Sequence, residues 1–253
     1  MAFPTLSTRR PVVDAPPRAS SHELERNGRG IDQFPRLIRS PQQSPSGSTG
    51  APAARYPGRV EPAKNLATWE ALRTLPEGLK AEIVRGVLVT PPAPLPRHSS
   101  VQGKLRRFIG GAFDDDDGLG GPGGWWVFLE VDVRLSPHDI VRPDLAGWRR
   151  ERLASPLDVR PIDVVPDWIC EIISTSNAGH DRVTKRELYA KHGVMHYWLA
   201  DPSAGTLETL RLDEQSKRWV DAGAFDVSAR ARIPPFQAIE LDLSRVFPPP
   251  VPW

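Results

Sequence analysis

The stretch VVPDWICEIIS, residues 164–174, decides the fold, because its mostly apolar run predicts a buried β-strand. A strand of this kind lies inside a sheet that is covered on both faces. One acidic residue, Glu171, interrupts the run. Burying an isolated carboxylate is costly unless something compensates it. Glu171 therefore lies at an exposed strand end, pairs with an arginine, or serves a function.

A second carboxylate, Asp144, follows Pro143 in the apolar stretch IVRPDLAGW, residues 140–148. This stretch reads as the return strand of a hairpin whose first strand is WWVFLEVDVRL, residues 125–135. Carboxylates on neighbouring strands can lie close enough to share a cation, and Mg²⁺ prefers oxygen ligands of this kind. Without a cation the two like charges would repel and raise one pKa. Asp144 and Glu171 therefore predict a divalent-metal site.

The elements around these strands predict an α/β fold. The core order is helix, three strands, helix, strand, which packs as a mixed β-sheet flanked by helices. Shorter elements precede this core and further strands follow it. The expected helices are 68–75, 98–113 and 181–193, with Gly193 as the last C-cap; the expected strands are two short ones joined near Arg85–Gly86, then 125–135, 140–148, 164–174, 194–201, 206–212, 217–225 and a closing segment 238–247.

Composition excludes several classes of protein. The net charge of +2 over 253 residues indicates no particular class of binding partner. Cys170 is the only cysteine, which excludes an intrachain disulfide and a cysteine zinc cluster. Strand alternation sets Cys170 on the face opposite Glu171. No apolar run approaches the roughly 20 residues that span a bilayer, and the N-terminus lacks a secretory signal. We therefore expect a cytoplasmic protein that does not bind membranes.

Residues 1–60 differ from the rest of the chain. They are rich in Pro, Ser and Arg, with nine Arg, no Lys and four acidic residues. Apolar residues are too sparse to offset the chain entropy, so we predict a disordered tail over 1–60 and one folded domain over 61–253. The tail either holds polyanions weakly or serves as a spacer, unless the start site is misassigned.

Six stretches occur in a fixed order between residues 66 and 248: AEIVRGVLV, PRHSSVQGKL, VRPDLAGW, VPDWICEIISTS, DRVTKRELYAKHGVMHYWLADP and IPPFQAIELDLSRVF. This ordered set resembles the PD-(D/E)XK nuclease superfamily, and within it the bacterial Uma-two group of restriction-endonuclease-like proteins. The resemblance implies a restriction-endonuclease-like fold with added N-terminal and C-terminal strands.

The resemblance implies that Asp144 is the motif aspartate and Glu171 the motif glutamate, with the backbone carbonyl of Ile172 as a further metal ligand. The motif lysine is expected two residues after the glutamate, where this chain has Ile173. In this pattern the lysine has moved to the following helix, which points to Lys185. An ordinary solvated helix lysine is the alternative.

Two further residues match the group. Glu82, in AEIVRG, is expected to add an auxiliary carboxylate, unless it pairs with Arg85 or Arg97. His98 is expected at the site, unless it makes a hydrogen bond at the start of its helix.

The resemblance implies a metal-dependent endonuclease that hydrolyses DNA phosphodiester bonds with one or two Mg²⁺ ions, for which Mn²⁺ could substitute. Lys185 would position the attacking water, Arg142 and Arg182 would hold phosphates, and a homodimer would suit double-strand cleavage. Ile173 in the lysine position favours an alternative, a catalytically decayed nucleic-acid-binding or interaction module. A structural protein with ion-paired carboxylates is the third reading.

Overall fold

A computed structural model describes residues 66–76, 78–115, 121–174 and 180–249, and the side chains of residues 180–182 lie outside the description. The predicted tail over 1–60 and the boundary at residue 61 also lie outside the described residues. Within the described residues no helix is long and apolar enough to cross a membrane.

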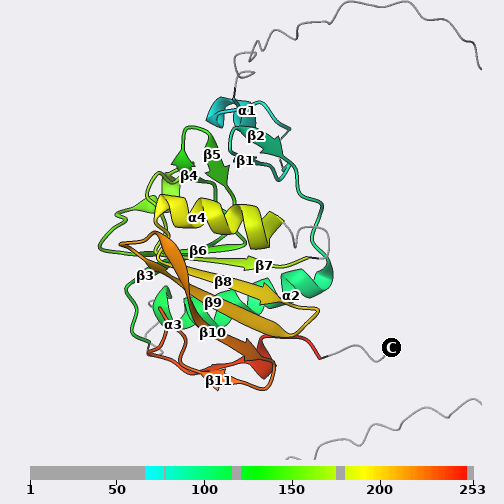
Figure 1. Ribbon diagram of the computed structural model, residues 1–253, viewed down its shortest axis with the longest axis vertical. Helices are drawn as coiled ribbons and strands as arrows, with labels where there is room; N and C mark the ends of the chain where they lie inside the picture. Colours follow the sequence, from blue (N-terminus) through cyan, green and yellow to red (C-terminus); the bar gives the residue numbers. More distant parts are fainter. Residues whose placement is uncertain (1–65, 77, 116–120, 175–179, 250–253) are drawn as a thin grey trace, which may run out of the picture. The chain divides into compact units, whose positions relative to one another are not determined.

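The described chain alternates short helices and strands in the predicted order (Figure 1). The elements are α1 (Trp69–Arg73), β1 (Glu82–Val84), β2 (Val87–Val89), α2 (Pro96–Leu105), η1 (Arg106–Gly110), α3 (Gly111–Phe113), β3 (Trp125–Leu129), β4 (Val133–Ser136), β5 (Asp139–Val141), β6 (Leu145–Arg149), η2 (Pro156–Asp158), β7 (Trp168–Ile172), η3 (His180–Lys185), α4 (Arg186–His192), β8 (His196–Asp201), β9 (Thr206–Asp213), β10 (Arg218–Asp226), β11 (Arg230–Ala231), β12 (Leu241–Asp242) and η4 (Leu243–Arg245).

The main sheet has six strands in the order β10-β9-β8-β7-β6-β3. Strand β7 is central, as its apolar sequence predicts, and all five of its residues are buried. It pairs parallel with β8 and antiparallel with β6, so the sheet is mixed. The α/β fold class is confirmed.

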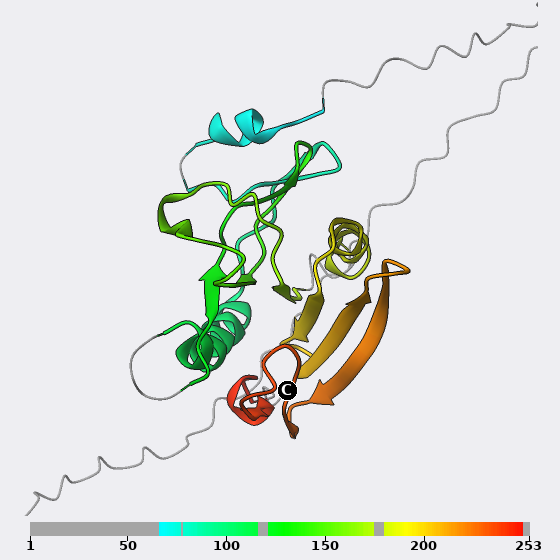
Figure 2. The same ribbon diagram turned by 90° about the vertical axis from the view of Figure 1, so that its left-hand side faces the viewer.

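The two faces of β7 belong to different apolar clusters. Trp168, Cys170 and Ile172 pack in the cluster that includes α2, whereas Ile169 and Ile173 pack in the cluster that includes α4. Helices α2 and α4 therefore cover opposite faces of the sheet (Figures 1 and 2). Cys170 is fully buried on the face away from Glu171, as alternation predicts.

The predicted hairpin over 125–148 forms, but it divides between two sheets. Its outer part, β4 and β5, joins a four-stranded sheet in the order β2-β1-β5-β4, and its inner part, β3 and β6, stays in the main sheet. The prediction of two continuous strands is therefore wrong. The break follows β3 at Glu130, whose φ of 50° is left-handed and incompatible with a β-ladder. On the return strand the break falls at residues 142–144 and frees Asp144 from regular pairing.

Strands β1 and β2 join at Arg85 and Gly86, as predicted. Both residues have positive φ, 53° and 76°, the conformation that a two-residue hairpin turn needs. A Cβ atom on Gly86 would lie 2.6 Å from Cδ2 of Leu66. The turn therefore requires glycine there, and it fixes Glu82 at the start of β1.

The predicted helix over 181–193 begins with the π-helical segment η3 and continues as α4. Gly193 ends α4 with a left-handed φ of 84°, as its predicted C-cap role requires. Lys185 is the last residue of η3, and π-helical turns often occur at functional sites.

Candidate active site

Asp144 lies at the break in the hairpin, one residue before β6. Leu145 pairs with Cys170, so the same register continued by one residue sets Asp144 opposite Glu171. The backbone N–H of Ile172 donates to Oδ2 of Asp144 at 2.8 Å. The two carboxylates therefore come from neighbouring positions of adjacent strands and line the same cavity, and their sharing of a cation stays a prediction.

The Asp144 side chain is only 6% exposed. Burial works to raise its pKa, but hydrogen bonding and charge from His98, the charge of Lys80 and the Ile172 N–H outweigh burial. The pKa of Asp144 is therefore held below its usual value, and the carboxylate is ionised at neutral pH.

Glu171 faces the α4 side of the sheet and is 2% exposed. Its Oε1 lies 3.0 Å from Nζ of Lys185 and accepts a hydrogen bond of 2.6 Å from the hydroxyl of Tyr189. Burial raises the pKa of Tyr189 well above its usual value, and the neighbouring Glu171 and Glu82 raise it further, so the hydroxyl remains a donor.

Glu82 joins the same cluster through Lys185, whose Nζ lies 3.1 Å from Oε1 of Glu82. The backbone N–H of Arg142 donates to that oxygen at 2.7 Å. The two arginines considered as alternative partners bind elsewhere: Arg85 pairs with Glu187, and Arg97 donates to the carbonyl of Pro202. The alternative pairing of Glu82 is therefore wrong.

His98 lies in the first turn of α2, and its Nε2 is 3.1 Å from Oδ2 of Asp144. Its Nδ1 is buried and has no hydrogen-bond partner among the described residues. The alternative of a helix-start hydrogen bond is therefore wrong, and His98 instead supports Asp144. One turn later, Nε2 of Gln102 donates to the backbone carbonyl of Asp144 at 3.1 Å.

The charged side chains of this cluster and His98 line one cavity of about 220 Å³. Its charged lining comes from β1 and the segment just before it, α2, the hairpin break, β7 and η3, which lie far apart in the sequence. The lining includes Lys80, Glu82, His98, Asp144, Glu171, Ile172 and Lys185.

Lys80 is a charged residue of the cavity lining that the sequence reasoning missed. Its Nζ lies 3.4 Å from Oδ1 of Asp144 and 3.4 Å from Oε1 of Glu130. Burial acts to lower the pKa of Lys80, but the charges of Asp144, Glu130, Glu171 and Glu82 prevail and raise it. A signal existed in LKAEIV, where Lys80 stands two positions before Glu82, as residues on one face of an extended segment do.

The model of the family Uma2, described as "Putative restriction endonuclease", matches residues 69–244. The chain belongs to the Uma2 family. The restriction-endonuclease-like assignment made from the motifs is confirmed.

One solved structure similar to this Uma2 chain is described as a "putative nuclease belonging to DUF820 from Anabaena variabilis ATCC 29413". It has a TM-score of 0.57 and 22% sequence identity, and the match covers 72% of this chain and 97% of that chain. At this identity the likeness shows the fold alone. No curated protein matches the chain significantly.

The donor set of this Uma2 site suits a hard cation. Within the described ranges, no three His, Cys, Asp or Glu side chains form a ready-made metal cluster. Mg²⁺, however, is commonly held by one or two carboxylates together with several waters. Asp144 and Glu171 supply two such carboxylates at one cavity, and Lys80 and Lys185 now balance their charge. The residues present therefore fit a magnesium ion, which would compete with the ammonium groups of Lys80 and Lys185 for the two carboxylates.

Arg142 and Arg182 are both predicted to hold phosphates, but only the side chain of Arg142 lies within the described residues. The Nε of Arg142 donates to Asp132 at 2.7 Å, and its side chain lines a separate, larger cavity. The side chain of Arg182 lies outside the described residues.

Proposed function

We propose that this Uma2 protein is a metal-dependent endonuclease that hydrolyses phosphodiester bonds of DNA. The observation that carries the proposal is the convergence of Asp144, Glu171, Glu82 and Lys185 on one small cavity. The description of the family and that of the similar solved structure, both of which name a nuclease, support the reaction class. Burying this many charges is costly, and a purely structural role gives no reason for placing them around an open space.

Asp144, Glu171 and the carbonyl of Ile172 would hold Mg²⁺, with Mn²⁺ as a substitute. When bound, the ion would acidify a water and polarise the phosphate. The protein's own part is positioning. His98 and the N–H of Ile172 both bond Oδ2 of Asp144, which leaves Oδ1 directed toward Lys80 and available to a cation.

Lys185 takes the role of the missing motif lysine in this proposal. Its ammonium bridges Oε1 of Glu171 and Oε1 of Glu82, so its position is fixed from two sides. From there it orients the attacking water and stabilises negative charge that develops on the phosphate. Glu82 acts through Lys185, as a positioning residue.

Plasmid cleavage tests the proposal. Supercoiled DNA incubated with the full chain should be cut in Mg²⁺ or Mn²⁺ and remain intact in EDTA. A melting temperature that rises with Mg²⁺ would show cation binding independently of cutting. Asp144→Asn should abolish both effects. Asp163→Asn is the matched control, because Asp163 is an exposed aspartate whose arginine partner lies outside the cavity. Linear product formed without a nicked intermediate would support the homodimer.

The second candidate function is a nucleic-acid-binding module without catalysis. It is favoured by the two lysines, which already neutralise the carboxylates without a metal. A mobility shift of DNA in the wild-type chain without any cutting in either metal would establish it and contradict the nuclease.

A further inference from the structure

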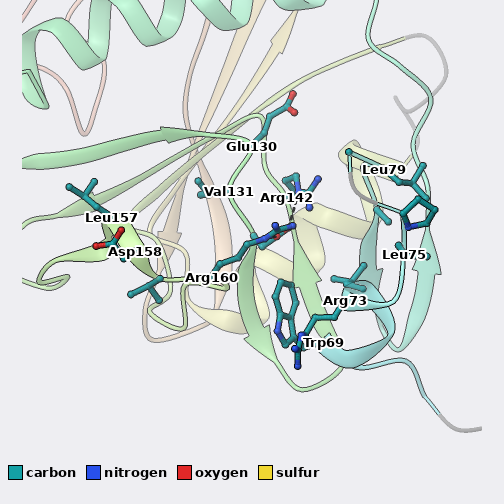
Figure 3. Close-up of a pocket in the computed structure, with 16 residues that line it drawn as sticks. Trp69, Arg73, Leu75, Leu79, Glu130, Val131, Arg142, Leu157, Asp158 and Arg160 are labelled. Carbon is teal, nitrogen blue, oxygen red and sulfur yellow. Dashed lines mark hydrogen bonds and ion pairs between the residues drawn. The ribbon is translucent and has the colours of Figure 1, made fainter.

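A second cavity, of about 860 Å³, lies beside the carboxylate cavity. Pockets of roughly 300–1,000 Å³ are typical of small-molecule ligands. Arg142 and Arg160 lie side by side at its centre, between Leu75 and Leu79 on one side and Leu157 on the other (Figure 3). The nuclease chemistry proposed above does not use this space.

The two arginines share one buried carboxylate. The Nε of Arg142 lies 2.7 Å from Oδ1 of Asp132, and the Nε of Arg160 lies 2.6 Å from Oδ2. The Asp132 side chain is 3% exposed, so it fixes both guanidinium groups. No hydrogen bond joins their Nη atoms to any described residue. The two guanidinium groups share a single carboxylate, and guanidinium Nη groups match phosphate oxygens well.

Apolar and aromatic groups complete the walls. The guanidinium carbon of Arg160 lies 5.8 Å from the centre of the half-buried Trp69 ring. Three aliphatic side chains of the lining are unusually open: Leu79 is 44%, Leu157 72% and Val159 52% exposed. An aromatic ring and open aliphatic surface beside phosphate-binding groups suit a nucleobase with its phosphate.

The two cavities adjoin through named contacts. Arg142 and Asp144 are two residues apart, which spans at most about 7 Å. Lys80 of the carboxylate cavity also bonds Glu130 of the second cavity. A strand cut beside Asp144 would therefore pass Arg142.

We propose that this second cavity binds one unpaired nucleotide of the strand that is cut. The inference rests on the proposed function and names its substrate class. Arg142 and Arg160 hold the phosphate, and the base lies against Trp69 and the open leucines. A paired base could not leave its duplex to enter the cavity without losing its stacking, so DNA with an unpaired nucleotide binds better than a perfect duplex.

The acidic groups of the lining do not oppose this arrangement. Oε1 of Glu130 is already bonded by Lys80 and Gln102, and Asp132 is held by the two arginines. Asp158 lies next to Leu157 at the far wall in Figure 3, away from the arginine pair.

The test measures DNA binding in EDTA, so that no cutting intervenes. Fluorescence anisotropy of the full chain would compare a labelled perfect duplex with the same duplex carrying one bulged nucleotide. Arg160→Ala removes one of the two arginines that hold the phosphate, and Trp69→Ala removes the aromatic ring against which the base lies. Arg230→Ala is the matched control: Arg230 is 67% and Arg160 69% exposed, and each has one aspartate partner. Trp69→Phe keeps an aromatic ring in case Trp69→Ala fails to fold.

We expect the wild type to bind the bulged duplex about tenfold more tightly than the perfect one. Arg160→Ala should remove this preference, Trp69→Phe should keep most of it, and Arg230→Ala should leave it unchanged. Equal binding of both duplexes by the wild type, or equal losses in Arg160→Ala and Arg230→Ala, would overturn the subsite. The subsite and the nuclease fail separately: a chain that keeps the preference but never cuts in Mg²⁺ refutes the nuclease alone.

Discussion

Nζ of Lys185 lies 3.0 Å from Oε1 of Glu171, although the two residues stand 14 positions apart on η3 and β7. The position where the nuclease motif has its lysine holds Ile173, which is 6% exposed and packs in the apolar cluster with Leu188 and Tyr189. The strand therefore uses that position for the core, and the ammonium reaches the carboxylates from the helix instead.

Lys185→Met should strongly destabilise the protein. Its side chain is 6% exposed and contacts two carboxylates that are each 3% exposed. Removing the cation leaves those charges buried without compensation, which costs about 3–5 kcal/mol. Urea unfolding measures the loss. Because a bound cation would replace part of the lost charge, Mg²⁺ should stabilise this variant more than the wild type.

Lys191→Met is the control for that change. Lys191 is 69% exposed and lies 3.8 Å from Asp139, so its loss should cost less than about 0.5 kcal/mol. Equal stability losses in the two variants would show that Lys185 does not compensate the buried charges of Glu82 and Glu171.

Tyr189→Phe should destabilise the protein by about 2 kcal/mol, because a hydrogen bond to a charged group is worth about 1.5–3 kcal/mol. The hydroxyl donates to Glu171 at 2.6 Å, and the rest of the ring would still pack in its cluster. The same change should slow Mg²⁺-dependent plasmid nicking, since Glu171 would lose one of the bonds that orient it. Unchanged unfolding and nicking would contradict the importance of this bond.

Much of the fold and of the site could be predicted from local sequence. The apolar run around Glu171 predicts a central strand, because few other elements bury every residue over so short a length. Gly193 ends α4 because glycine readily adopts the left-handed φ of a helix C-cap. The turn at Arg85–Gly86 can be predicted for the same reason, since it also needs positive φ. The pairing of Leu145 with Cys170 brings Asp144 and Glu171 to neighbouring positions of adjacent strands, where both line the small cavity.

The missed features depend on tertiary contacts. Lys80 stands before the first residue of β1, and although its two-residue spacing from Glu82 predicts a shared face, its reach to Asp144 follows only from packing. The break at Glu130 gives no local signal, because a non-glycine residue with positive φ is held there by its surroundings. Asp132 and Arg160 pair across 28 positions, which no local pattern predicts.

Gly86→Ala should destabilise the fold by about 1–3 kcal/mol, because the residue has a φ of 76° and its new Cβ would meet Leu66. Gly103→Ala is the control, because here alanine is expected to stabilise the protein rather than destabilise it. Gly103 lies inside α2, and a Cβ there would have no heavy atom within 4 Å. Alanine there should stabilise the helix by about 0.5–1 kcal/mol. Thermal unfolding of both variants measures the contrast, and a neutral Gly86→Ala would contradict the strained turn.

His196 should make the protein less stable as the pH falls from 6.5 toward 4. Its pKa is lowered from 6.5 to about 4, mainly by burial and also by the charges of Arg211 and Arg149, which the charge of Asp167 partly opposes. Above pH 6.5 the imidazole is neutral in both states, so the native state loses nothing. Between 6.5 and 4 the unfolded chain takes up the proton first, and stability falls.

The full conversion of this pKa shift overstates the effect, because the side chain is partly exposed to solvent. We therefore expect His196 to account for a loss of about 1–2 kcal/mol between pH 7 and pH 4. Urea unfolding at pH 7, 5.5 and 4.5 should show a shallower decline for His196→Gln than for the wild type, because glutamine binds no proton. Other acidic groups titrate over the same range in both proteins, so the difference between the two curves isolates this histidine. Parallel curves would mean that His196 has the same proton affinity in the folded and unfolded chain.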